Sequence, residues 1–261
     1  MSLDKSIFNA DLYTSLHRFW FGDSSNRDYS QNASKWFGMG QTPAQKKAFD
    51  NECASHFSRA LESISPSKYP LREWQGYDQD LQHAHEIAAP FLAQLKSPPK
   101  TENSNEETLL SMCILLDQIP RNIYRDKQTL PLVYNHYDRI SFALVNASVD
   151  VIRTTLKKVG GGGRHPMEVM WLWMPLLHSE YRPAHELVGE FVRDVKNRCA
   201  PDSQEVKMME MAEKSAVDHR EIVKRFGRYP HRNISLGRET TKEEKEYLVT
   251  ADTFGVSQDG T

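Results

Sequence analysis

The sequence is poor in cysteine. Its 261 residues contain three, Cys53, Cys113 and Cys199, which lie far apart along the chain. No two of them have the C-x-x-C spacing of a metal site. Cys113 lies within the apolar stretch SMCILL, where a buried thiol packs as a small hydrophobic group. Reduced thiols are typical of an intracellular compartment, so the composition predicts a cytoplasmic protein.

Long apolar runs are absent as well. The N-terminus, MSLDKSIFNADLY, lacks the continuous apolar run of a signal peptide. The most apolar segment, MEVMWLWMPLL, has about half the length that a membrane-spanning helix needs. We therefore expect a soluble chain without a membrane partner.

An excess of either charge is also missing. The 33 Lys and Arg residues nearly balance the 35 Asp and Glu residues, which leaves a net charge of −2. Proteins that bind nucleic acid usually carry a basic field, so we expect no nucleic-acid partner. With 39% hydrophobic and 26% charged residues, the chain has the composition of a globular domain with a sizeable core.

Alternating patterns long enough for a strand do not occur, whereas helical periodicity dominates. The clearest helix follows Thr42-Pro43, with threonine as N-cap and proline at the first helical position. Its apolar stripe comprises Phe49, Cys53, Phe57, Ala60 and Leu61. Further helices are expected at about 11–21, 106–119, 138–158, 167–180, 184–198 and 203–226, and a capping box at Thr241–Glu244 opens a last one. The sequence thus predicts an all-α fold, either a superhelix or an irregular bundle of antiparallel helix pairs.

Parts of this single domain, residues 1–261, are expected to lie outside its core. Residues 65–104 have proline-rich and polar borders around a helix at 78–95, which predicts a surface insertion whose deletion leaves the fold intact. Residues 251–261 are expected to form a flexible tail. The four glycines 160–163 lack the Lys-Ser/Thr of a phosphate-binding loop, so they predict a flexible connection between helices.

Polar groups interrupt the helical core first in LLDQIPRNIYR, residues 115–125. Pro120 lacks a backbone N–H and is expected to end or kink the helix at Ile119. A structural carboxylate–guanidinium clamp and a ligand site both fit this junction, because arginine presents a rigid fork to a carboxylate. The break gathers four polar side chains, those of Asp117, Gln118, Arg121 and Arg125.

The second interruption is the end of the apolar segment 167–180, where His178, Ser179 and Glu180 follow one another. Burial at the rim of an aromatic helix shifts the pKa of titratable groups, which is typical of functional sites. A core histidine satisfied by a backbone carbonyl is the structural alternative.

The third interruption follows the helix at 203–226, whose apolar stripe includes His219. Gly227 is a natural C-cap, and several cationic side chains follow it closely. Cations stabilise a helix C-terminus, so part of this cluster could serve stability alone. Alternation with Phe226, Tyr229 and Pro230 favours partial burial over a solvated basic face. The cluster comprises Arg225, Arg228, His231, Arg232 and Asn233.

These segments carry a resemblance to a known family. FWFG, a following WF pair, LLDQIPRNIYR, MPLLHSE, RFGRYPHRN and LGRETTKEE together resemble the family catalogued as domain of unknown function 924. The resemblance implies a tetratricopeptide-like all-α superhelix. Its signature positions fall on Trp20, Phe21, Trp36, Asp117, Gln118, Arg121, Asn122, Arg125, His178, Ser179, Glu180, His219, Arg225, Arg228, His231, Arg232 and Asn233. Tyr229 stands where phenylalanine is commoner in the family.

We expect these positions to form one pocket in a small-molecule enzyme or binding protein. An anionic substrate would be held by arginines, and His178 or His219, poised by Glu180 or Asp117, would act as general acid or base. The expected catalytic residues are His178, Glu180, His219 and Asp117. The expected substrate-binding residues are Arg121, Arg125, Gln118, Arg228, His231, Arg232, Asn233, Trp20 and Trp36. A further expectation is that His178, Glu180, His219 and Arg232 converge.

Two other functions compete with the enzyme hypothesis. A helical-repeat scaffold would bind a protein or peptide partner in a concave groove, although fold alone does not establish function. A metal site would combine His165 and Glu168 with His178 and Glu180, but Pro166 lies inside the first pair. We therefore expect no metal and no cofactor.

Overall fold

The computed structural model describes residues 2–22, 29–96, 105–161 and 163–251. Within these ranges the chain is all-α, which confirms the predicted fold class. The β-type pairing in them is limited to an isolated bridge between Val159 and Arg164. The tetratricopeptide-like superhelix remains an implication of the family resemblance. No helix in the described ranges combines the length and the apolarity that crossing a membrane requires.

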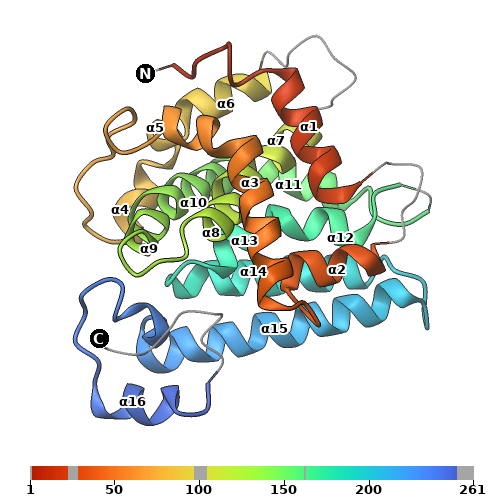
Figure 1. The fold of residues 1–261 in the computed structure, drawn as a ribbon. Coiled ribbons are helices and arrows are strands. Elements are labelled where there is room, and N and C mark those ends of the chain that lie inside the picture. Colours follow the sequence, from red (N-terminus) through yellow and green to blue (C-terminus); the bar gives the residue numbers. More distant parts are fainter. Residues whose placement is uncertain (1, 23–28, 97–104, 162, 252–261) are drawn as a thin grey trace.

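The helices differ widely in length and are often interrupted (Figure 1). The first half of the chain forms α1 (Ala10–Phe21), α2 (Ser30–Phe37), α3 (Pro43–Ser63), α4 (Tyr77–Gln82), α5 (Ala84–Ile87), α6 (Ala89–Lys96), α7 (Asn105–Cys113), the π-helix η1 (Ile114–Gln118) and α8 (Ile119–Ile123). The second half forms α9 (Leu130–Leu132), the π-helix η2 (Val133–Tyr137), α10 (Asp138–Ala147), α11 (Val149–Leu156), α12 (Pro166–Val169), the 3-10 helix η3 (Met170–Leu172), α13 (Met174–Leu177), α14 (Arg182–Lys196), α15 (Gln204–Phe226), the 3-10 helix η4 (Pro230–Arg232) and α16 (Lys242–Leu248).

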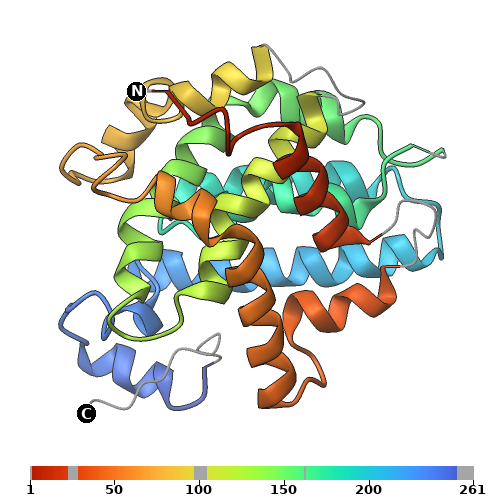
Figure 2. The same cartoon turned by 45° about the horizontal axis from the view of Figure 1, so that its top comes forward.

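One hydrophobic cluster runs through most of the described chain, from Leu3 to Ala216. The α7–η1 segment belongs to this cluster, and its Leu109, Met112 and Leu116 are fully buried at helical spacing. The long helix α15 (blue) crosses one side of the molecule, and α2 lies beside it in both views (Figures 1 and 2).

The predicted helix ends agree with local chemistry. The Thr42 hydroxyl accepts from Gln45 N, and the Gln45 side chain accepts from Thr42 N, which completes a capping box at α3. Thr241 and Glu244 form the predicted capping box at α16. Gly227 closes α15 in the left-handed region at φ 71°, where glycine avoids the steric cost of a Cβ atom.

Several expected helices are divided in the structure. Of the two outcomes expected at Pro120, an end of the helix at Ile119 does not occur, because η1 widens the helix there and α8 continues to Ile123. Ile119 N donates to Ile114 O, five residues back, and Pro120 then occupies the first turn of α8, where no N–H donor is needed. The expected helix at 138–158 divides into α10 and α11, and the one at 78–95 into α4, α5 and α6. The apolar segment 167–180 is not one helix either, since it divides into α12, η3 and α13.

The described part of the expected insertion, residues 65–96, is exposed over much of its length but contributes side chains to the core. Ala88 and Phe91 are fully buried within the main cluster, and Arg139 of α10 makes a bidentate ion pair with buried Asp80 at 2.8 Å for each bond. The polar borders predicted a surface position, but the short helices between them bury one side against the core. Residues 97–104, and residues 252–261 of the expected tail, lie outside the described residues.

The burial of this segment has a measurable consequence. Leu95→Ala, at a side chain that is 8% exposed, should lower the free energy of unfolding by about 2–3 kcal/mol, because it removes buried methyl groups and leaves a cavity. Leu81→Ala, at a side chain that is 38% exposed in the same segment, should have an effect below about 0.5 kcal/mol. Urea denaturation of both variants measures the difference. Equal, small effects would restore the surface-insertion interpretation.

Candidate functional site

The centre of the site is a hydrogen-bonded pair formed by Asp117 and His178. Asp117 lies in η1, and its side chain is 1% exposed. His178 follows α13 as its C-cap residue. Nδ1 of His178 lies 2.8 Å and 3.0 Å from the two carboxylate oxygens of Asp117. Stretches of π-helix are frequent at functional sites, and here one places a carboxylate opposite an imidazole.

The Asp117 carboxylate determines the tautomer of His178. An ionised carboxylate only accepts hydrogen bonds, so Nδ1 carries the proton and Nε2 is the acceptor nitrogen. Burial lowers the pKa of His178, Arg121 lowers it further, and Asp117 only partly opposes them. Burial opposes the charge of Asp117, but Arg121 and His178 outweigh it and hold the pKa of that carboxyl below its ordinary value. Near neutral pH the pair therefore consists of an ionised aspartate and a neutral histidine.

Arg121 connects this pair to a second carboxylate. Its guanidinium donates to both oxygens of Asp138, at 2.7 Å and 2.9 Å, and to the backbone carbonyl of Asp117 at 2.7 Å. Nη1 also lies 3.3 Å from Asp117 Oδ1. The structure therefore contains the carboxylate–guanidinium clamp that was one of the two alternatives for this segment, and Asp138 is the bidentate partner of Arg121.

A cavity of about 620 Å³ adjoins the pair, and we call it the His178 cavity. Its walls come from α2, α3 and the segment between them, and from η1, α8, α13 and α15 with the residues that follow α8 and α13. All of its charged lining residues are basic, namely Lys35, Lys46, Arg121 and Arg125. The uncharged polar lining residues are Gln41, Gln118, Asn122, His178, Ser215 and His219. The remaining wall residues are Trp36, Phe37, Gly38, Met39, Phe49, Met174 and Leu177.

Comparison with known proteins places the chain in a family. The family model described as "Bacterial protein of unknown function (DUF924)" matches residues 16–252. The chain belongs to the DUF924 family. A solved structure of a protein of unknown function from Agrobacterium tumefaciens is 22% identical and covers 95% of this chain and 100% of its own, with a TM-score of 0.55, so it shows the fold alone. No curated protein matches the chain.

Several of the predicted site residues line the His178 cavity. His178 and His219 line it together, which agrees with the expected convergence of these two histidines. Nδ1 of His219 donates to Ser215 O at 2.8 Å, and burial lowers the pKa of His219 to about 4. The other predicted residues in its wall are Gln118, Arg121, Arg125 and Trp36.

Of the two carboxylates expected to poise a histidine, Asp117 contacts His178, whereas Glu180 bonds to other groups. Its buried carboxylate accepts from Tyr229 N at 2.9 Å and pairs with Arg238 at 2.9 Å. Glu180 is not among the residues that line the His178 cavity. Because the apolar segment is broken into short helices, Glu180 is directed to the C-terminal segment, whereas His178 meets Asp117.

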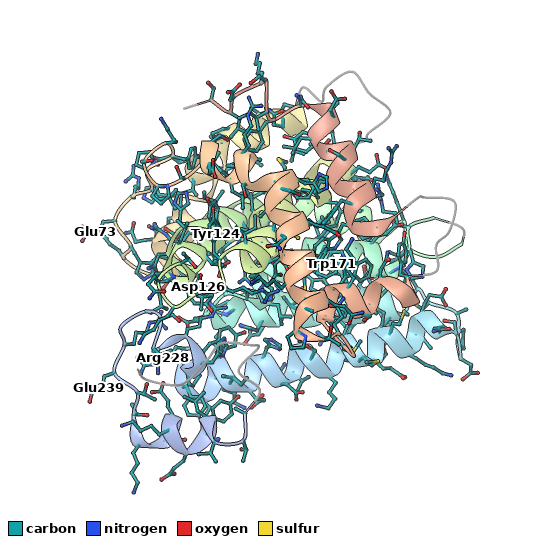
Figure 3. The ribbon with its side chains drawn as sticks, viewed as in Figure 1. Glu73, Tyr124, Asp126, Trp171, Arg228 and Glu239 are labelled. Carbon is teal, nitrogen blue, oxygen red and sulfur yellow. The ribbon has the colours of Figure 1, made fainter. Side chains whose placement is uncertain are left out.

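The expected arginine cluster does not form a single anion site. Arg228 pairs with Glu244 at 2.7 Å and, with Asn233, ties α16 to the preceding segment, in the C-terminal part of the molecule (Figure 3). Arg125 pairs with Asp50 at 2.6 Å. Arg232 donates to the backbone carbonyl of His178 at 2.8 Å, so it supports the histidine from outside the cavity wall.

The remaining signature residues have mainly packing roles. Nε1 of Trp36 donates to Trp20 O at 3.0 Å, and only Trp36 of these two lines the His178 cavity. His231 is 7% exposed, and burial lowers its pKa to about 2.

The four residues of the alternative metal site do not come together within the described residues: His165 caps α12, Glu168 accepts from Tyr29, and His178 bonds to Asp117.

Four charged or hydroxyl-bearing residues of this region were not predicted from the sequence. Lys35, Lys46 and Ser215 line the cavity, and Asp138 is the partner of Arg121. Ser215 lies one turn before His219 on the predicted helix, so the helical spacing could have found it. The two lysines and Asp138 carry no local signal, because each reaches the site only through packing of distant helices.

Proposed function

We propose that this DUF924 protein is an enzyme that uses His178 as a general base on a small anionic molecule bound in the His178 cavity. The observation that carries the proposal is the Asp117–His178 hydrogen bond at the wall of a cavity whose charged lining residues are all basic. An oriented imidazole beside space for a small molecule is the arrangement that proton transfer to or from a substrate requires.

Each residue then has a role that follows from its contacts. Asp117 holds the Nδ1–H tautomer and stabilises the imidazolium that forms when Nε2 accepts a proton from the substrate. Lys35, Lys46, Arg121 and Arg125 present positive charge to the cavity, although Arg121 and Arg125 also pair with Asp138 and Asp50. Arg121 is thus a positioning residue for Asp117 as well as part of the wall.

The proposal predicts which substitutions abolish turnover. His178→Gln should lower kcat/KM by about 10²–10⁴-fold, because the general base is lost. Asp117→Asn should also impair turnover, since an amide no longer imposes the Nδ1–H tautomer. Substrate loss from a panel of anionic molecules, namely phosphate monoesters and carboxylates, measured by mass spectrometry, tests this. His56→Gln is the matched control, because His56 is exposed and lies outside the cavity wall.

The pH profile supplies an independent check on the same base. His178 acts when neutral and its pKa is lowered in the folded protein, so kcat/KM should fall only as pH drops through a value below 6.5. An unimpaired His178→Gln variant, or a rate that rises as the pH falls below 6.5, would refute the assignment.

A further inference from the structure

A second cavity, of about 420 Å³, adjoins the His178 cavity, and we call it the methionine pocket. Seven of the nine methionines of the chain line it, namely Met39, Met167, Met170, Met174, Met208, Met209 and Met211. Its other lining residues are Ala33, Phe37, Trp173, Leu177, Val188, Ala212, Ser215 and Ala216, so no charged side chain is present.

The two cavities are continuous in their walls. Phe37, Met39, Met174, Leu177 and Ser215 line both of them. A ligand that contacts this shared wall therefore has basic and polar groups on one side and only apolar side chains and one hydroxyl on the other. The pocket lies between α2 and α15, which run side by side (Figures 1 and 2).

Three large apolar side chains that line the methionine pocket are exposed to solvent. Phe37, Met39 and Met211 are 45%, 53% and 68% exposed, although large apolar side chains are more stable when buried. Methionine is unbranched and polarizable, so a wall built from it adapts to a flexible apolar ligand. A rigid protein core would instead use branched side chains with defined rotamers.

We infer that the substrate of the His178 cavity is amphiphilic, with an anionic head near the basic residues and an aliphatic chain in the methionine pocket. This inference rests on the proposed function for the head group, but the chain site is a separate prediction. Charge complementarity selects the orientation, because of these two cavities the His178 cavity is the one with cations among its described lining residues, whereas those of the methionine pocket carry no charge. Burial of the chain then supplies affinity that the polar contacts alone do not provide.

The test uses straight-chain alkanoates as probes, from butanoate to decanoate, below their aggregation concentrations. Isothermal titration calorimetry on the full chain should show about fourfold tighter binding for each added methylene, until the pocket is filled. Ala212→Phe places a ring in the pocket and should abolish this chain-length dependence. Val217→Phe is the matched control, because Val217 is 41% exposed on the same helix and does not line the pocket.

The outcomes separate the two proposals. Chain-length dependence that disappears in Ala212→Phe and persists in Val217→Phe supports the inference. Affinity independent of chain length, an equal loss in both variants, or no binding of any alkanoate would overturn it. His178→Gln should retain the chain-length dependence, because the imidazole lies at the head-group end. If that variant also retained full turnover, the proposed catalysis would fail while the chain site would stand.

Discussion

As pH falls from about 6 to 5, the free energy of unfolding is expected to fall by about 4 kcal/mol per pH unit, which is the slope for uptake of about three protons on unfolding. The largest contributions come from His185, His219 and His231, and His17, His136 and His178, whose pKa values burial also lowers, add in the same direction. Burial lowers the pKa of His185 and His219 to about 4 and that of His231 to about 2. Each of these histidines is neutral in the folded chain at a pH where the unfolded chain binds a proton.

The sign follows from this difference. Above the unfolded pKa of about 6.5 neither state is protonated, so these histidines leave stability unchanged. As pH falls below that value, the unfolded state gains protons while the folded state does not, until the folded pKa is reached. Since a domain is typically stable by about 5–15 kcal/mol, we expect acid unfolding near pH 5, before most carboxylates titrate.

Urea denaturation at half-unit steps between pH 7.5 and 5 measures the slope. His219→Gln should reduce it by about 1.4 kcal/mol per pH unit, because one buried imidazole no longer takes up a proton on unfolding. His85→Gln is the control, since the His85 side chain is exposed. A slope of one proton or less would show that these imidazoles are not held neutral.

The second large effect is expected at Arg121. Arg121→Met should lower the free energy of unfolding by about 3–5 kcal/mol, because it leaves the buried carboxylates of Asp117 and Asp138 without their closest cation. Arg121→Met should therefore lower the free energy of unfolding at least as much as Asp117→Asn does. If Arg121 served only to hold a ligand, its replacement would instead leave the stability nearly unchanged. Arg125→Met should cost about 1 kcal/mol or less, because its pair with Asp50 is 51% exposed on the arginine side.

Thermal and urea denaturation of Arg121→Met and Arg125→Met give this comparison directly. A nearly neutral Arg121→Met variant would mean that the clamp contributes nothing and that the guanidinium serves a ligand alone. A large loss for Arg121→Met would still be compatible with the proposed enzyme, since Arg121 positions Asp117 and lines the cavity. Turnover of the refolded variant then separates these roles.

Much of the fold could be predicted because its causes are local. The apolar stripe from Phe49 to Leu61, the capping boxes at Thr42 and Thr241, and the C-cap at Gly227 depend on residues within a few positions of one another. The errors occurred where packing overrode local preference. Pro120 is accommodated by η1, and the segment around Phe91 is drawn into the core despite its polar borders.

The site divides in the same way. Composition and motif determined that the chain is all-α, that it belongs to the DUF924 family, and that His178, His219 and Asp117 are candidates for chemistry. Tertiary structure alone decided that His178 bonds to Asp117 rather than to Glu180, and that Arg121 forms an ion pair with Asp138. It also decided that the methionines of α12, η3, α13 and α15 line one pocket. Helical periodicity specifies which face of a helix is buried, but the partner across that face depends on how distant helices pack.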